Sequence, residues 1–142
     1  VLNGHGGNSF KQMIRELGAI FTEMFICQID FYRVLDQTRF FDNPDDHAGE
    51  METSVMMHVE PDLVLPLDEA GDGSAKTFAV RGLREGWVWA ERHWREVTES
   101  TGVGDPSKAT AEKGARYLDA LTSQIGSFLV DLAEADLDAL YE

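Results

Sequence analysis

Val1-Leu2-Asn3-Gly4-His5-Gly6-Gly7-Asn8-Ser9 is the stretch that decides the fold of this chain. Two apolar residues lead into a histidine flanked by glycines, and Asn8 or Ser9 can cap a helix that starts with Phe10. This order predicts a buried strand, a tight turn and a helix. Ligands bind at the carboxyl ends of strands in open α/β sheets, so His5 is a candidate site residue. An ordinary strand-to-helix turn with an incidental histidine explains the pattern about as well as a functional site does.

The next stretch completes a strand–helix–strand unit. Apolar residues at helical spacing predict an amphipathic helix over about residues 8–22. The β-branched and aromatic run from Met24 to Tyr32 predicts a second strand that is buried on at least one face. A βαβ unit with short connections implies a parallel sheet with a right-handed crossover. We therefore expect the α/β class and a single domain over residues 1–142.

Two further helices are expected in the rest of the chain. Asp46 is a plausible N-cap for a helix that runs to His58 and stops before Pro61. Asp105 or Ser107 is expected to cap a last helix that reaches about residue 133, after which the acidic end frays. Elsewhere the sequence predicts loops at 36–48 and 68–75, a short strand at 76–80, and irregular structure with at most one edge strand at 81–106.

The composition argues against several classes of function. The net charge of −14, from 26 acidic and 12 basic side chains, disfavours binding to nucleic acid or to an anionic membrane surface. The single cysteine, Cys27, rules out an internal disulfide, fits a reducing, cytoplasmic compartment, and lies in an apolar run typical of a buried structural thiol. The sequence contains no apolar run long enough to span a bilayer and no signal peptide, and its opening strand looks truncated.

Histidine and carboxylate side chains at the ends of strands and helices form the metal sites of hydrolases, and the natural set here is His5, His47, Glu50 and Glu52. His47 and Glu52 straddle the start of one expected helix, so both can face one cavity, whereas Glu50 and Glu52 should point in different directions. Acidic residues at a helix start more often only stabilise the helix dipole. His58 is expected to be partly buried, and His93 to lie at the surface or at an interface.

Three motifs stand out when the chain is considered as a whole. They are Asn-Gly-His-Gly-Gly-Asn at 3–8, His-Ala-Gly-Glu-Met-Glu-Thr-Ser at 47–54, and Gly-Val-Gly-Asp-Pro at 102–106, which runs into Thr-Ala-Glu-Lys-Gly at 110–114. In this order and separation they resemble the creatininase family of metal-dependent amidohydrolases. The resemblance implies a three-layer α/β/α fold with a mostly parallel central sheet, of which this chain is a C-terminal portion. It also implies hydrolysis of a C–N bond in a small cyclic amide by a metal-activated water.

The same resemblance implies roles for individual residues. His5 would ligate one metal ion, Glu52 would complete the shell of a second, and His47 would move a proton during ring opening. Two divalent ions, Zn, Mn or Fe, are implied for a complete site, and Gly6, Gly7, Asp46 and Glu50 are expected to contact the small-molecule substrate. Creatininase itself has a glutamate two places after the first histidine, where this chain has Gly7. A substrate other than creatinine is therefore expected.

Other interpretations stay open at this point. The resemblance places the family's Glu-x-His pair and bridging Asp in an N-terminal part of the domain that precedes the motifs quoted above, so a complete site would require that part. We also expect a homo-oligomer. The segment Arg84-Glu85-Gly86-Trp87-Val88-Trp89 faintly resembles members that open oxidised, inosose-type inositol rings. A non-catalytic fragment that keeps the fold and a flavodoxin-like binding module are the remaining alternatives. Trp87, Trp89 and Trp94 would either wall a pocket or bury area between subunits.

Overall fold

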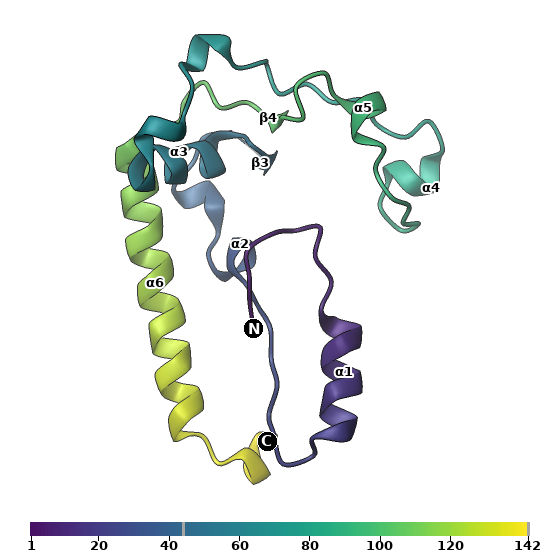
Figure 1. Ribbon diagram of the computed structural model, residues 1–142, viewed down its shortest axis with the longest axis vertical. Coiled ribbons are helices and arrows are strands. Elements are labelled where there is room, and N and C mark those ends of the chain that lie inside the picture. The colour runs from purple at the N-terminus through teal and green to yellow at the C-terminus, as the bar shows by residue number, and fades with distance from the viewer. Residues whose placement is uncertain (44, 142) are drawn as a thin grey trace. The chain divides into compact units, whose positions relative to one another are not determined.

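The computed structural model describes residues 1–43 and 45–141, and its elements are shown in Figure 1. Contacts divide the chain into two compact units. Unit 1 consists of residues 1–37 and 119–142, and unit 2 consists of residues 38–118. The expectation of a single domain over residues 1–142 stays a prediction.

Unit 1 is built on a short βαβ unit. Strand β1 (Leu2–Asn3) pairs in parallel with β2 (Ile29–Asp30), and helix α1 (Lys11–Ile20) connects them. The backbone pairing begins just before the strands, because the Ile29 amide donates to the Val1 carbonyl over 2.9 Å. This parallel pair with a helical connection confirms the arrangement that the opening sequence predicts.

The boundaries within unit 1 differ from the predicted ones. The strand predicted from Met24 to Tyr32 is paired only at β2, and helix α2 (Phe31–Val34) follows it directly. Neither Asn8 nor Ser9 caps α1, since Phe10 is the N-cap and its side chain makes no capping bond. Strand β1 is not buried as a whole, because Leu2 is 64% exposed while Asn3 is 1% exposed. The side chain of Asn3 is therefore the buried anchor of this strand.

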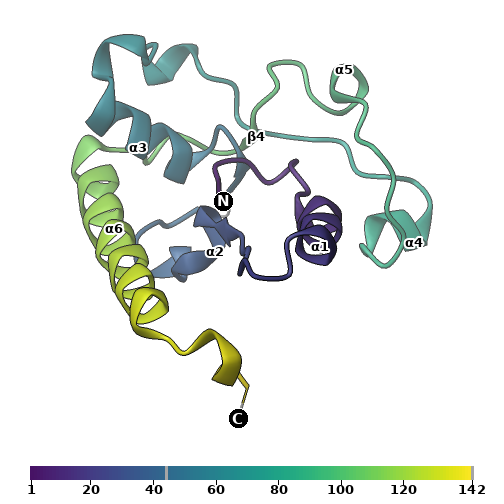
Figure 2. The same ribbon diagram turned by 60° about the horizontal axis from the view of Figure 1, so that its bottom comes forward.

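Unit 2 contains a small antiparallel pair, β3 (Asp45–His47) with β4 (Val103–Gly104), and helix α3 (Glu50–Val59) follows β3. Helix α6 (Ala111–Glu134) begins in this unit, and Figures 1 and 2 both show its first turns beside α3. Gly114 permits this close approach, because an added Cβ would lie 2.0 Å from the carbonyl oxygen of Ser54. The other elements are 3₁₀ turns at Pro61–Leu63 and Leu67–Glu69 and the short helices α4 (Arg81–Arg84) and α5 (Trp94–Val97).

Tyr117 forms the centre of the apolar core of unit 2. Its side chain is fully buried, and its ring lies 5.4 Å from that of Phe40 and 5.2 Å from that of Phe41, both in edge-on arrangements. Met51 of α3 is also buried, with 4% of its surface exposed. This core fixes the first turns of α6 against the segment that leads to β3 and against α3, which carries the candidate site.

Several boundary predictions for unit 2 were wrong. Asp46 lies within β3 and does not cap α3, which begins after Gly49. Neither Asp105 nor Ser107 caps α6, because the hydroxyl of Thr110 accepts the Lys113 amide at 3.2 Å. Residues 76–80 form no strand. The predicted end of α3 before Pro61 and the end of α6 near residue 133 are confirmed. The range 81–106 contains one short strand, as predicted, but also the helices α4 and α5, where irregular structure was predicted.

The chain ends in unit 1 with the last turns of α6 and a 3₁₀ turn at Leu137–Ala139. Leu121 is buried on the predicted apolar stripe of α6, whereas Phe128 on the same stripe is 38% exposed. Among the described residues, no helix is both long and apolar enough to cross a membrane.

Candidate functional site

His5 lies in the turn that follows β1, as the sequence predicts. The buried carboxamide of Asn3 organises this turn, since its oxygen accepts the His5 amide at 3.2 Å and the Asn8 side chain at 3.1 Å. The amide nitrogen of the same carboxamide donates to Asp30 at 2.8 Å. This hydrogen bond is the main reason that the pKa of Asp30 lies below its usual value, and a bond from Gln28 adds to it. The asparagine thereby ties the histidine turn to the neighbouring strand.

Gly7 sets the orientation of the His5 ring. Its backbone amide donates to Nδ1 of His5 at 2.9 Å, and a Cβ at this position would lie 3.0 Å from the imidazole. A larger residue would therefore push the ring out of place. A metal ion ligated through Nδ1 would have to replace the Gly7 amide as the partner of that nitrogen, because an imidazole nitrogen has one lone pair.

His47 and Glu52 are brought together in unit 2. His47 is the last residue of β3, and Ala48 then takes a left-handed conformation with φ of +52°. The Ala48 amide donates to Oε2 of Glu52 at 2.6 Å, and the same carboxylate oxygen lies 3.8 Å from Nδ1 of His47. About a third of each side chain is exposed, 31% for His47 and 33% for Glu52. The two side chains therefore lie close together, but only Glu52 lines the cavity described below, so the expectation that both face one cavity stays a prediction. A strand end and not a helix start carries the histidine.

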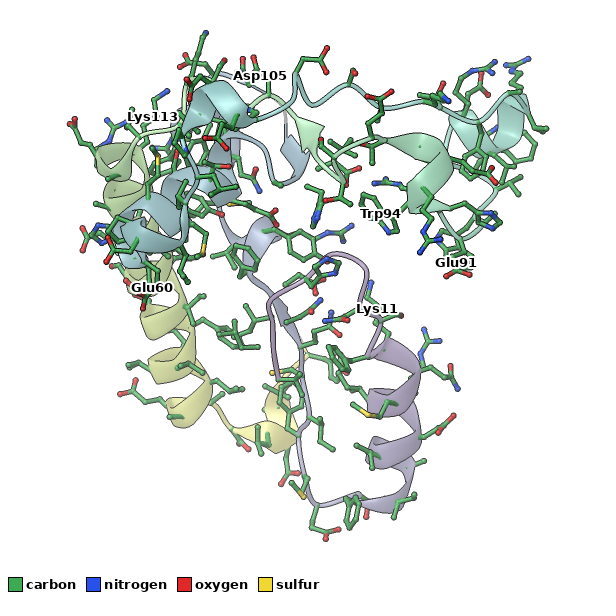
Figure 3. All side chains as sticks on the ribbon, turned by 45° about the horizontal axis from the view of Figure 1, so that its top comes forward. Lys11, Glu60, Glu91, Trp94, Asp105 and Lys113 are labelled. Atoms are coloured by element: carbon green, nitrogen blue, oxygen red, sulfur yellow. The ribbon has the colours of Figure 1, made fainter. Side chains whose placement is uncertain are left out.

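Trp94 packs against the imidazole of His47, and the sequence did not single it out for that role. The centroids of the Trp94 and His47 rings are 5.0 Å apart, and the rings are tilted by 54°. The Arg92 guanidinium lies 4.9 Å from the centroid of the indole ring, and it forms an ion pair with Asp46 at 2.6 Å. Figure 3 shows the Trp94 side chain beside the ribbon of α5.

Glu50 is fully buried and fully engaged within the protein. Its carboxylate accepts the backbone amides of Asp42 at 2.9 Å and Asn43 at 2.7 Å, and it forms an ion pair with Lys113. Hydrogen bonds to Asp42 and then to Glu50 raise the pKa of Lys113, and the bond from Lys113 lowers the pKa of Asp42. This geometry indicates a structural role for Glu50, while the substrate contact expected of it stays a prediction. Figure 3 labels Lys113 on α6.

The remaining candidates lie away from this cluster or are exposed. Trp87 and Trp89 are 72% and 86% exposed, so neither walls a pocket within its unit. His58 is exposed on the last turn of α3, which corrects the expectation that it is partly buried, and His93 is exposed as expected. The free thiol of Cys27 is half-buried rather than fully buried.

A cavity of about 380 Å³ opens beside Glu52 in unit 2. Glu52 is one of two acidic side chains in its wall, which is otherwise mostly aliphatic. The lining residues are Ala48, Glu52, Thr53, Met56, Leu63, Val64, Leu65, Pro66, Leu67, Glu69, Ala70 and Pro106. Its volume is within the range that holds small organic ligands.

The donor set of this chain fits a divalent ion in kind but is incomplete in number. Imidazole and carboxylate groups suit Zn, Mn and Fe, and His5 and Glu52 supply one of each. Within the described ranges of each unit, no three His, Cys, Asp or Glu side chains gather closely enough to hold a metal ion. The metal roles of these residues stay predictions.

Known proteins match this chain in part of their length. Mycofactocin precursor peptide peptidases of Mycobacterium ulcerans and Mycolicibacterium smegmatis are 40% and 42% identical to it over 74 residues. That stretch is 51% of this chain and 27% of each relative. A crystal structure from Bacteroides fragilis, of a protein with the provisional name creatinine amidohydrolase, matches 99% of this chain at 46% identity, with a TM-score of 0.89. The chain spans 55% of that protein.

A second solved structure has the same fold at low sequence identity. It is a mutant creatininase complexed with creatine, with a TM-score of 0.67 and 20% identity, and the match covers 94% of this chain and 56% of that one. Both structural matches confirm the predicted α/β class. The family model for creatinine amidohydrolase matches residues 1–129, which is most of the chain. This protein therefore belongs to the creatininase family.

Proposed function

We propose that the protein is a metal-dependent hydrolase that cleaves an amide C–N bond with an activated water. The observation that carries the proposal is the pairing of His47 and Glu52 directly after β3, with the Ala48 amide fixing the carboxylate. Family membership and a turn that presents His5 after β1 support it.

The residues divide the chemistry between them. Glu52 and His5 are the donors that would hold divalent ions, Zn, Mn or Fe. Such ions, when bound, polarise the amide carbonyl and make water nucleophilic near neutral pH. His47 has a partly exposed imidazole at a strand end, where it can meet substrate and pass a proton to the leaving nitrogen. The Ala48 amide holds one oxygen of Glu52 and thereby orients the carboxylate.

The substrate is proposed to be a small cyclic amide or a peptide amide. The peptide is supported by the relatives named as peptidases, which are 40–42% identical over 74 residues, and the cyclic amide is supported by the Bacteroides fragilis protein with the provisional name creatinine amidohydrolase, which is 46% identical over 99% of this chain. The mostly apolar wall of the cavity beside Glu52 also suits a substrate with an aliphatic portion better than a small polar ring. An inosose-type ring remains the alternative suggested by the segment from Arg84 to Trp89.

The test is a comparison of two variants of the full-length protein. Glu52→Gln should lower metal occupancy and turnover together, because an amide is a weaker ligand than a carboxylate. His47→Asn should keep its metal and lower kcat by roughly 10²–10⁴-fold, the usual effect of removing a general acid–base group. Metal analysis and kinetics with cyclic amides and short peptides measure both effects.

Matched controls separate these roles from general damage. Glu60→Gln and His58→Asn change the same residue types on or next to α3, at exposed positions, and should leave metal content and kcat unchanged. If His47→Asn loses metal while Glu52→Gln keeps it, the assigned roles are reversed. If neither variant affects the turnover of any amide, the hydrolase proposal fails, and a non-catalytic fragment that keeps the fold becomes the better interpretation.

A further inference from the structure

Four side chains of unit 2 form a closed set of contacts around the imidazole of His47. Asp46 and His47 are neighbours in β3, while Trp94 is the first residue of α5 and Arg92 precedes it by two residues. Asp46 binds Arg92, Arg92 covers the indole of Trp94, and Trp94 lies against His47. The end of β3 and the segment around Trp94 are thus joined by two contacts, the ion pair of Asp46 with Arg92 and the ring contact of His47 with Trp94.

We propose that Trp94, oriented by Arg92 and Asp46, is a positioning residue that fixes the His47 imidazole for proton transfer. This inference rests on the proposed function, in which His47 carries the proton. Trp94 does not have to touch substrate for this role. Asp46 then acts through Arg92.

The physical reason is the rotational freedom of an imidazole ring. The second side-chain torsion of histidine is broad, so a partly exposed ring is not held by its own backbone. In this structure Glu52 limits the ring on one side, at 3.8 Å from Nδ1, and the indole limits it on another. These two contacts restrict the rotation of the ring, and misplacement of a reacting group by about 1 Å can lower a rate by about 10²-fold.

The contacts among Asp46, Arg92 and Trp94 are better suited to orienting the indole than to stabilising the folded protein. Asp46 and Arg92 have exposed fractions of 55% and 37%, and exposed ion pairs contribute little to folding. Their contact instead decides where the guanidinium lies on the indole face, through a cation–π interaction. The α5 segment is anchored separately, since the Lys76 amide donates to the Val97 carbonyl at 2.8 Å. Loss of the Asp46 carboxylate should therefore leave α5 folded and loosen Trp94.

The experiment compares Trp94→Leu, Trp94→Phe and Trp89→Leu in the full-length protein. Trp94→Leu should lower kcat by about 10–100-fold, with KM changed less than about twofold and metal content unchanged. Trp94→Phe keeps an aromatic face and should recover most of kcat. Trp89→Leu is the matched control, because Trp89 is 86% exposed, and it should behave as the unmodified protein. Equal kcat for Trp94→Leu and Trp89→Leu would overturn the inference.

A second measurement asks whether Trp94 acts through His47. In a His47→Asn background, Trp94→Leu should cause no further loss of kcat, since residues that act as one unit are strongly non-additive. A further loss as large as in the unmodified background would mean that Trp94 acts independently, and the inference would fail.

A readout without turnover separates this inference from the proposed function. The indole should shift the ring-proton NMR signals of His47, assigned by their loss in His47→Asn. The shift should vanish in Trp94→Leu and persist in Trp89→Leu. Absence of the shift refutes the positioning contact even if the enzyme is active. Presence of the shift together with turnover that is insensitive to His47→Asn refutes the proposed function, and with it the positioning role, while leaving the contact in place.

Discussion

Gly114→Ala should destabilise the protein even though alanine is the better helix former. Gly114 is buried in the first turns of α6, where a Cβ would lie 2.0 Å from the carbonyl oxygen of Ser54 and 2.9 Å from the amide nitrogen of Val55. Real Cβ atoms essentially never approach other atoms closer than 3.0 Å. Because these atoms belong to the backbone of α3, no side-chain rotation relieves the clash, and the two helices must move apart.

The size of the effect follows from three contributions. Overfilling a packed contact costs about 1–3 kcal/mol. Separating the helices also breaks the hydrogen bond from the Thr110 amide to the Ser54 hydroxyl, 3.2 Å long, which contributes about 1 kcal/mol. The higher helix propensity of alanine offsets about 1 kcal/mol. We expect Gly114→Ala to lower the free energy of unfolding by about 1–3 kcal/mol.

Gly126→Ala is the matched control in the same helix. An added Cβ at Gly126 meets no atom within 4 Å, so only the propensity gain applies, and this variant should be more stable by about 0.5–1 kcal/mol. Denaturant unfolding of the full-length variants, followed by circular dichroism, measures both changes. If Gly114→Ala is as stable as Gly126→Ala, the close crossing of α6 and α3 is wrong.

Two further predictions concern the stability of the core of unit 2. Stability should fall as the pH rises above about 10, because hydrogen bonds to Asp42 and Glu50 raise the pKa of Lys113 from 10.5 and burial raises the pKa of Tyr117 from 10.0. Both groups bind their protons more tightly in the folded state, so their contribution is present at lower pH and is lost on alkalinisation; unfolding midpoints that stay constant up to about pH 11 would contradict this. Lys113→Met should destabilise more than Asp42→Asn, because it leaves the buried Glu50 carboxylate without its cation, and equal thermal midpoints would refute the assigned role of Glu50.

Local patterns in the sequence were sufficient for part of the fold and of the site. The change from apolar residues to glycine before His5 correctly predicts that a strand ends there. Pro61 correctly predicts the end of α3, because the residue before a proline avoids the helical region. The spacing of His47 and Glu52 was enough to expect them in one region, because residues so close in sequence cannot diverge far around a helix start.

Two kinds of contact decide what the sequence could not predict: pairing between distant segments and hydrogen bonds that close competing local turns. Asp46 looks like a helix cap, but pairing of β3 with β4 draws its segment into a strand. Asp105 also looks like a cap, yet its side chain accepts the Ser107 amide at 2.9 Å and closes a turn before the helix begins. The contact of Trp94 with His47 joins segments far apart in the chain, so no local pattern announces it.

The left-handed conformation of Ala48 bears on how this site can change under selection. A non-glycine residue at φ of +52° carries roughly 1–2 kcal/mol of backbone strain, which the protein retains next to His47. Glycine at this position would relieve the strain but would loosen the backbone amide that holds the Glu52 carboxylate. Residue 48 is thus a position at which one substitution can relieve backbone strain and loosen the Glu52 carboxylate while the side chains of His47 and Glu52 stay the same.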